Sequence, residues 1–329
     1  MTVQSTSSNK HDEFQLYYFW KTNELEILLY HYKMMSLTQM SFLDLYMNRN
    51  PLITSPSEEG DVSAIVYGIP FDSTHSFRPG TRFGPDAVRQ AFNNIEIFST
   101  RFNVDLESVN IEDLGNTYHT VVATEVLDMI GKITTELAAR NKQMIILGGE
   151  HLITYGTYMS FPKETGYIVF DAHYDLRDEY ADIKLSHAAY LRRIIEKRGA
   201  ENIVHVGARS FVKEELAFKT EHKVNVVTDK DIREGKGPKM VKDFMSTFDK
   251  IYVSIDLDVL DPAFAPGVGN PEAMGITSRE LFDMIYALED NTIRCMDIVE
   301  LCPPYDNGAT ASVAAKLMSE VIAMNLSRK

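Results

Sequence analysis

Six side chains of this sequence have the types and the spacing needed to bind divalent cations. They are His151, Asp171, His173, Asp175, Asp256 and Asp258. Four carboxylates gathered in a protein interior would repel one another and lose their hydration unless cations neutralised them. Four aspartates and two histidines can hold two divalent ions if some carboxylates bridge, and this ligand set favours manganese over zinc.

Each group of candidate ligands directly follows a short run of β-branched and apolar residues. Alternate residues of an extended chain project to the same side, so Asp171, His173 and Asp175 are expected to share one side. The same alternation places both aspartates of the run 254–258 on one side. Two glycines stand two and three residues before His151, where they let the backbone turn sharply and present the histidine.

These groups need a scaffold that brings several strand ends together. Runs of strand length recur along the chain, at 64–69, 144–147, 167–170, 203–206, 224–227, 251–255 and 295–299. Amphipathic stretches of helical length lie between most of them, among them 121–140, 187–198 and 278–288. This alternation predicts a single α/β domain whose mainly parallel sheet is flanked by helices on both faces. Ligands of such sheets bind beyond the carboxyl ends of the strands, where the three groups lie.

The composition excludes some classes of partner. The chain of 329 residues has 33 Lys and Arg against 47 Asp and Glu, which is a formal net charge of -14. Such a charge disfavours nucleic acid and anionic lipid, and mildly favours cationic ligands. No stretch approaches the roughly 20 apolar residues of a membrane span, and no signal-peptide pattern is recognisable. We therefore expect neither a nucleic-acid nor a membrane partner.

The two cysteines, Cys295 and Cys302, are seven residues apart in one apparent strand. They should point to opposite faces of that strand, so they cannot bridge each other. This predicts reduced cysteines and a cytoplasmic location.

Residues 1–50 differ in composition from the rest of the chain, with many aromatic residues and no glycine. We interpret them as an N-terminal appendage. The catalytic domain is then expected to comprise residues 51–329.

Four stretches resemble the motifs of one enzyme family. Gly-Gly-Glu-His (148–151), Asp-Ala-His-Tyr-Asp (171–175) and Ser-Ile-Asp-Leu-Asp-Val-Leu-Asp-Pro (254–262) resemble the three signatures of the ureohydrolases, which include arginase and agmatinase. Residues 68–89 resemble the agmatinase-type loop that follows the first strand. The resemblance extends from about residue 62 to about residue 325, with its motifs in the family's order.

The resemblance implies an arginase-like three-layer fold, a homo-oligomer (trimer or hexamer) and two manganese ions per chain. One ion would be held by His151, Asp171, Asp175 and Asp256. The other would be held by Asp171, His173, Asp256 and Asp258. Two ions roughly 3.5–4 Å apart can share a water and lower its pKa, and the resulting hydroxide would attack a guanidinium carbon. Asp175 would accept the proton and help pass it to the departing amine.

Two further residues take a role from the resemblance. His187 stands where the family has an active-site histidine that relays protons. Glu300 ends a predicted strand, and a buried glutamate that needs a partner fits a bidentate guanidinium well. The implied catalytic residues are thus Asp175 and His187, and Glu300 is the implied substrate-binding residue.

The sequence departs from the family pattern at two places. Glu150 stands where an aspartate is usual, which should change only hydrogen bonds around the metal ligands. Val268-Gly269-Asn270 stands where threonines usually flank the glycine, which removes two hydroxyls from the expected substrate site.

Loop 176–186 should decide which guanidine is cleaved. It has no asparagine of the kind that holds the α-amino and α-carboxylate groups in arginases. Its acidic residues Asp178, Glu179 and Asp182 should disfavour a carboxylate and suit an amine. This predicts cleavage of agmatine, a small cationic guanidine, to putrescine and urea, a step of polyamine biosynthesis. Arg177 could instead receive the acid end of guanidinobutyrate or arginine, so both stay alternatives.

Interpretations from other classes fit less well. A zinc deacetylase of related fold binds one metal and would not need both His151 and Asp258. A catalytically silent binding protein would have lost at least one ligand, whereas all six are present. A nucleotide-binding protein would have a glycine fingerprint that opens a helix after the first strand, and none is found.

Overall fold

The computed structural model of the protein describes residues 41–48, 52 and 62–328. Contacts between Cα atoms divide the chain into two compact units, Met1–Leu45 and Tyr46–Lys329. The described part of the first unit is residues 41–45, which form most of helix α2 (Phe42–Tyr46). The predicted N-terminal appendage therefore lies largely outside the described residues, and the division at residue 50 stays a prediction.

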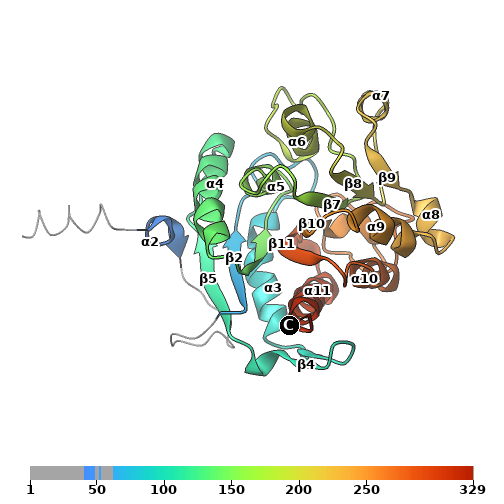
Figure 1. Cartoon of the computed structure of the whole chain (residues 1–329). Helices are drawn as coiled ribbons and strands as arrows, with labels where there is room; N and C mark the ends of the chain where they lie inside the picture. Colours follow the sequence, from blue (N-terminus) through green and yellow to red (C-terminus); the bar gives the residue numbers. More distant parts are fainter. Residues whose placement is uncertain (1–40, 49–51, 53–61, 329) are drawn as a thin grey trace, which may run out of the picture. The chain divides into compact units, whose positions relative to one another are not determined.

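A nine-stranded sheet forms the centre of the described part of the second unit (Figure 1). Its strands lie in the order β1 (Met47–Asn48), β5 (Ile111–Thr117), β2 (Ala64–Ile69), β6 (Gln143–Gly148), β11 (Thr292–Val299), β10 (Lys250–Asp256), β7 (Gly166–Phe170), β8 (Ile203–Val206) and β9 (Asn225–Val227). All neighbouring pairs are parallel except β1 with β5. The predicted mainly parallel sheet is confirmed. A separate pair, β3 (Phe98–Ser99) and β4 (Val104–Asp105), is antiparallel.

Helices cover both faces of the sheet (Figure 1). On one side lie α4 (Ala123–Ala139), α5 (Ile153–Tyr158) and α6 (Tyr190–Arg198). Three hydroxyl contacts fix this side: Tyr67 of β2 with Thr134 of α4 (2.8 Å), Tyr252 of β10 with Thr157 of α5 (2.7 Å), and Tyr167 of β7 with Tyr190 of α6 (3.2 Å). On the other side lie α3 (Gly84–Phe92), α9 (Gly237–Met245), α10 (Ser278–Tyr286) and α11 (Ala309–Leu326). The predicted three-layer α/β arrangement is confirmed.

Apart from α2, the other helical segments of the described residues lie between these elements along the chain. They are α7 (Lys213–Glu221), α8 (Asp229–Arg233) and the 3-10 turns η1 (Thr81–Phe83), η2 (Leu106–Ser108), η3 (His187–Ala189), η4 (Leu257–Val259) and η5 (Pro303–Tyr305). The predicted helix 187–198 thus begins as the turn η3 before α6 follows.

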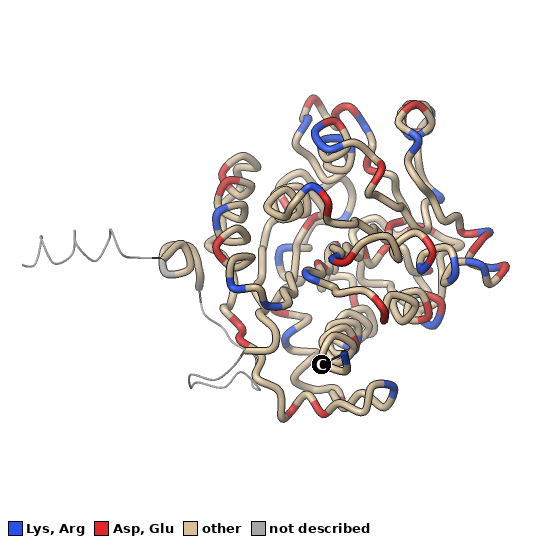
Figure 2. Tube along the Cα trace, viewed as in Figure 1, with Lys and Arg blue, Asp and Glu red and all other residues tan. Residues whose placement is uncertain are grey.

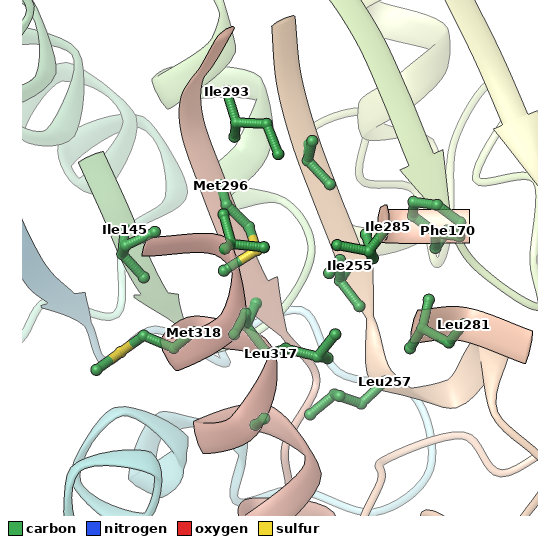
Figure 3. Close-up of a cluster of buried hydrophobic side chains, with 14 of the residues drawn as sticks. Ile145, Phe170, Ile255, Leu257, Leu281, Ile285, Ile293, Met296, Leu317 and Met318 are labelled. Atoms are coloured by element: carbon green, nitrogen blue, oxygen red, sulfur yellow. The ribbon is translucent and has the colours of Figure 1, made fainter. Parts of the chain in front are cut away.

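The main hydrophobic core fills the space between the sheet and α3, α9, α10 and α11 (Figure 3). Strand residues such as Ile145, Ile255 and Met296 pack there against Leu281 of α10 and Leu317 of α11. Their strand neighbours face the opposite helices, because successive side chains of a strand alternate between its two faces. Burial on both faces explains why the strands appear in the sequence as nearly continuous apolar runs.

β2 and β8 coincide with the predicted runs 64–69 and 203–206. β11 begins at Thr292, three residues before its predicted start. β5 was not predicted, because its sequence Ile-Glu-Asp-Leu-Gly-Asn-Thr lacks the β-branched continuity of the central strands.

The two cysteines are free and buried. Cys295 lies in β11, but Cys302 lies beyond the end of that strand, so the prediction that they share one strand is wrong. The chain leaves the strand direction at Glu300, whose φ of 65° ends the extended conformation.

Charged residues of both signs are interspersed along the outer helices, as Figure 2 shows for α4. Some form pairs one helical turn apart, such as Lys132 with Asp128 and Arg233 with Asp229. Among the helices of residues 41–48 and 62–328, none is long and apolar enough to cross a membrane.

Candidate metal centre

The four strands that precede the predicted site residues are neighbours in the middle of the sheet. They are β6, β11, β10 and β7, in that spatial order. Parallel pairing puts their carboxyl ends at one edge, where ligands of such sheets bind. Residues far apart in the chain, such as His151 and Glu300 with a separation of 149 positions, are therefore in direct contact there.

Local backbone interactions set the position of the ligand groups. After β7, Asp171 Oδ1 accepts a hydrogen bond from the His173 backbone N–H (2.6 Å). At the end of β10, Asp256 Oδ1 accepts one from the Asp258 backbone N–H (2.8 Å). Each bond closes a tight turn that directs its neighbouring side chains to the sheet edge.

The turn after β6 depends on a close approach of two backbones. Glu150 N–H donates to the Phe71 carbonyl oxygen (2.7 Å). A Cβ at Gly149 would collide with that same carbonyl group, so only glycine fits there. The requirement for glycine thus comes from this approach.

His151 lies at the centre of the first ligand group. Its Nδ1 lies 3.0 Å from Asp171 Oδ2, 3.1 Å from Asp256 Oδ2 and 3.6 Å from Asp175 Oδ2. All four side chains are at least nine-tenths buried. This set matches the four ligands predicted for the first ion.

His173 lies at the centre of the second group. Its Nδ1 lies 2.9 Å from Asp258 Oδ2 and 3.6 Å from Asp171 Oδ1. Asp171 therefore directs one carboxylate oxygen to each histidine, and it belongs to both groups of converging ligand atoms. Asp256 converges with the first group.

The orientation of these atoms fits a cation. His151 Nδ1 and Asp171 Oδ2 are buried, and neither has a hydrogen-bond partner among the described residues although they lie 3.0 Å apart. The two atoms are thus directed to the same buried space. Leaving both atoms unpaired would be costly, and nitrogen and carboxylate oxygen are suitable ligands for manganese.

The opposite side of the His151 ring is held by hydroxyl groups. Its Nε2 lies 2.9 Å from Ser254 Oγ and 2.9 Å from Tyr190 Oη. Ser254 donates in turn to Asp297, a buried carboxylate that also accepts from Thr154 and Tyr252. Contacts of this kind fix the ring orientation of a metal-ligating histidine.

Without a cation, the carboxylates of the site perturb one another. Burial lowers the pKa of His151, but Asp171 and the other acidic neighbours have the larger combined effect. They raise the pKa to about 9. Burial and the Asp171 carboxylate raise the pKa of Asp175 well above its usual range. Burial and Asp258 do the same to Asp256. A bound cation would offset the clustered negative charge that contributes to the raised pKa values.

His187 lies at the start of η3 and is buried beside the ligand groups. Thr74 Oγ1 lies 3.2 Å from its Nδ1, and Ser76 Oγ lies 3.3 Å from its Nε2. Burial lowers the pKa of His187 to about 4, so the ring is neutral near pH 7. It lines the same cleft as Asp175.

Glu300 lines the cleft from the end of β11. One carboxylate oxygen accepts from the His151 backbone N–H (2.9 Å), and the other lies 3.0 Å from His75 Nε2. Burial raises the pKa of Glu300, but His75, His187 and the His151 backbone N–H together lower it more, so the pKa of this carboxyl group lies below its usual range. Burial lowers the pKa of His75 and Glu300 raises it, with a net rise.

The cleft has a volume of about 450 Å³. Of the predicted site residues, its walls include His173, Asp175, His187, Asp256, Asp258 and Glu300. His151 and Asp171 lie behind this wall, where both are buried. The structure thus brings all eight predicted residues together at one edge of the sheet.

The loop residues predicted to face the distal end of the substrate do not line the cleft. Asp178 lies 3.0 Å from Arg193 and 3.5 Å from Lys184, which hold it at the surface. Glu179 and Asp182 are also outside the cleft wall, whereas Arg177 belongs to it. The three carboxylates thus lie outside the cleft wall, and their contribution to substrate choice stays a prediction.

Other residues near the cleft were missed by the sequence analysis. Glu272 is an acidic residue of the wall; it accepts from Ser210 Oγ (3.0 Å) and lies 3.6 Å from His173 Nε2. Thr74 and His75 contact His187 and Glu300, respectively. Both residues lie inside the stretch 68–89 that resembles the agmatinase-type loop, but no spacing pattern in the sequence marks them as site residues among their neighbours.

The chain is similar to known proteins over most of its length. Residues 62–324 match the model of the arginase family. The chain belongs to the arginase family. An arginase-family relative, the agmatinase of Bacillus anthracis, is 36% identical over 293 residues, which cover 86% of this chain and 98% of the relative. The N(1)-aminopropylagmatine ureohydrolase of Thermococcus kodakarensis is 36% identical over 77% of this chain and 88% of its own length.

An arginase-family structure has the same fold. The agmatine ureohydrolase of Thermoplasma volcanium superimposes with a TM-score of 0.80 at 31% identity, covering 85% of this chain and 95% of its own. The resemblance predicted from the motifs is thereby confirmed. Glu150, which stands where the family pattern usually has an aspartate, accepts hydrogen bonds from the Thr74 backbone N–H (2.7 Å) and from the Thr74 hydroxyl (2.6 Å).

Proposed function

We propose that this chain is a ureohydrolase that cleaves agmatine to putrescine and urea with two manganese ions. The observation that carries the proposal is the position of Asp171, which is shared by two groups of converging ligand atoms behind a cleft that Glu300 also lines. Membership of the arginase family and the agmatinases among its relatives support it. A substrate with a guanidinium group fits the buried carboxylate of Glu300.

His151, Asp171, Asp175 and Asp256 would hold one ion. Asp171, His173, Asp256 and Asp258 would hold the other. When bound, two such ions supply Lewis acidity and lower the pKa of water so that hydroxide is available near neutral pH.

The protein's own groups bind the substrate and transfer protons. Glu300 receives the guanidinium through charge-assisted hydrogen bonds. Asp175 accepts the proton released as the guanidinium carbon is attacked, and helps pass it to the departing amine. His187 is neutral near pH 7 and lines the same cleft, so it can relay a proton between solvent and the reacting groups.

Glu272 favours a substrate with a distal amine. Its side chain is 39% exposed in the cleft wall, where a cation can reach it, and the chain as a whole is acidic. Agmatine offers a guanidinium for Glu300 and an ammonium for Glu272. The names of the relatives, an agmatinase and an aminopropylagmatine ureohydrolase, point to the same class of cationic guanidines.

Guanidinobutyrate is a second candidate substrate, because Arg177 also lines the cleft. The Arg177 guanidinium lies 5.5 Å from the centre of the Tyr180 ring and could bind the carboxylate of this substrate. A relative at 28% identity is a guanidinobutyrase.

Urea release from agmatine, guanidinobutyrate, arginine and aminopropylagmatine by the manganese-loaded protein tests the proposal. We expect the highest kcat/KM for agmatine. A protein that binds manganese but releases urea from none of the four would refute the proposed function.

The proposal extends to the setting of the enzyme. The free cysteines agree with a cytoplasmic location. We expect a trimer or hexamer, which light scattering after size-exclusion chromatography would detect. A monomer that is active would refute this expectation.

A further inference from the structure

His75 occupies one side of the Glu300 carboxylate. His75 Nε2 lies 3.0 Å from Glu300 Oε2, and the other oxygen, Oε1, accepts from the backbone N–H of His151. Both side chains of the pair are at least 96% buried. Each carboxylate oxygen can accept more than one hydrogen bond, so Glu300 still has capacity for a guanidinium.

The His75 ring is packed tightly in place. It stacks on His187, with ring centroids 5.6 Å apart and planes inclined by 14°. Gly269 adjoins the ring closely enough that a Cβ there would collide with Cε1 and Nε2 of His75. The flanking Thr74 and Ser76 both contact His187. His75 is therefore fixed between the residue proposed to bind the guanidinium and the one proposed to relay protons.

We propose that His75 is a positioning residue for substrate binding, which holds the Glu300 carboxylate by an Nε2–H hydrogen bond in the orientation that receives the guanidinium. This inference rests on the proposed function. A glutamate has three rotatable side-chain bonds, so fixing it before the substrate arrives lowers the entropy cost of binding.

The charge of the ring matters, because a guanidinium brings a second positive charge to the same carboxylate. A neutral ring with its proton on Nε2 donates to Glu300 without competing with the substrate. His75 Nδ1 is buried with no hydrogen-bond partner in the described residues, which favours leaving it unprotonated. The charged groups that face His75 are Glu300, Glu150 and Asp72, beside the His187 ring. A bound guanidinium offsets these negative charges and so favours the neutral form.

The test is steady-state urea release by the manganese-loaded full chain and two variants of His75. In His75→Ala we expect KM to rise about tenfold or more, as for the loss of a hydrogen bond to a charged group, with kcat changed less than threefold. His75→Gln supplies an amide N–H at a similar reach, so KM should return to within about threefold of the wild type. Because Gln also restores side-chain volume, a difference between the two variants that comes from packing alone should be matched by a parallel difference in thermal unfolding.

Gly269→Ala probes the same contact without removing the imidazole. Its Cβ would displace the His75 ring, so we expect KM to rise in the otherwise wild-type chain. In the His75→Ala background the ring no longer fills this space, and only Glu300 Oε2 remains close, 3.3 Å from the Cβ position. The same substitution should therefore raise KM less in that background than in the wild type. His222→Ala, which removes an exposed imidazole stacked on Phe218, is the matched control and should leave KM unchanged. If His75→Ala fails to fold, the Gln and Gly269 variants still decide the matter.

A KM in His75→Ala within twofold of the wild type would overturn the inference, and so would equal impairment of the Ala and Gln variants. Manganese content and thermal unfolding are measured for each variant, to separate loss of positioning from loss of the site. The guanidine turned over best by the wild type is used throughout. If the wild type hydrolyses no guanidine, the proposed function has failed, a result distinct from an active wild type with an unaffected His75→Ala.

Discussion

Nδ1 of His151 and Oδ2 of Asp171 lie 3.0 Å apart without the geometry of a hydrogen bond. The two residues come after strands β6 and β7, which are separated in the sheet by β11 and β10. Their contact depends on loops that extend over the edge of the intervening strands. Once His151 has lost its proton, a cation between the two atoms would stabilise the pair, so the metal content of the protein is the first property to measure.

The first prediction concerns metal stoichiometry. We expect about two manganese ions per chain in the wild type by elemental analysis. Asp171→Ala should reduce the content well below one ion and abolish urea release, because this carboxylate belongs to both ligand groups. Asp256→Ala should also abolish activity, since Asp256 would bridge both ions. Asp283→Asn, on the exposed face of α10, is the control and should retain both ions. One zinc ion per wild-type chain would contradict a binuclear manganese site.

The second prediction concerns pH. In the metal-free protein the pKa of His151 is raised to about 9, and the pKa of Asp175 is raised well above its usual range. Protons on these groups must leave before they can bind a cation, so manganese affinity should increase as pH rises from 6 to 8. Calorimetric titration in two buffers of different ionisation enthalpy would measure the protons released. Equal affinity at pH 6 and pH 8, with no proton release, would be inconsistent with these ligands.

The third prediction separates proton transfer from metal binding. His187→Ala should lower kcat for agmatine by roughly 10²-fold, as expected for a general acid–base group. Its manganese content should remain that of the wild type, because His187 belongs to neither ligand group. His222→Ala serves again as the remote histidine control. Full activity of His187→Ala would remove His187 from the mechanism.

The fourth prediction concerns the distal end of the substrate. Replacing Glu272 by Gln removes a negative charge from the cleft wall while keeping the side-chain size. KM for agmatine should rise roughly tenfold, corresponding to about 1.4 kcal/mol, while guanidinobutyrate should become a better substrate. Asp178→Asn, which removes a carboxylate outside the cleft wall, should change neither value. Should Asp178→Asn instead alter the preference, the distal end of the substrate would lie in loop 176–186.

The fifth prediction compares two glycines. Gly149→Ala should destabilise the protein by about 1–3 kcal/mol, because the new Cβ collides with the Phe71 backbone. Gly131→Ala in α4 meets no atom within 4 Å and should stabilise by about 0.5–1 kcal/mol through its better helix propensity. Chemical denaturation of both variants measures the difference. A Gly149→Ala protein as stable as the wild type would show that the turn after β6 can relax.

The sequence by itself determined the sheet and the ligand types. Continuous apolar runs indicated strands buried on both faces, and two of them, β2 and β8, have the predicted bounds. The ligand positions could be predicted because each group directly follows a strand, and parallel strands end at the same edge. The expectation of manganese over zinc also came from residue types alone.

Only the tertiary structure decided which side chains face the cleft. Asp178 was expected to lie beside the substrate, but ion pairs with Arg193 of α6 and with Lys184 of the same loop hold it outside the cleft wall. Glu272 reaches the cleft wall and His75 reaches Glu300 because loops that follow β10 and β2 lie at the same edge of the sheet. Local periodicity encodes strands and turns through neighbouring residues. Ion pairs and packing between distant segments have no local periodicity, so they become visible only once the chain has folded.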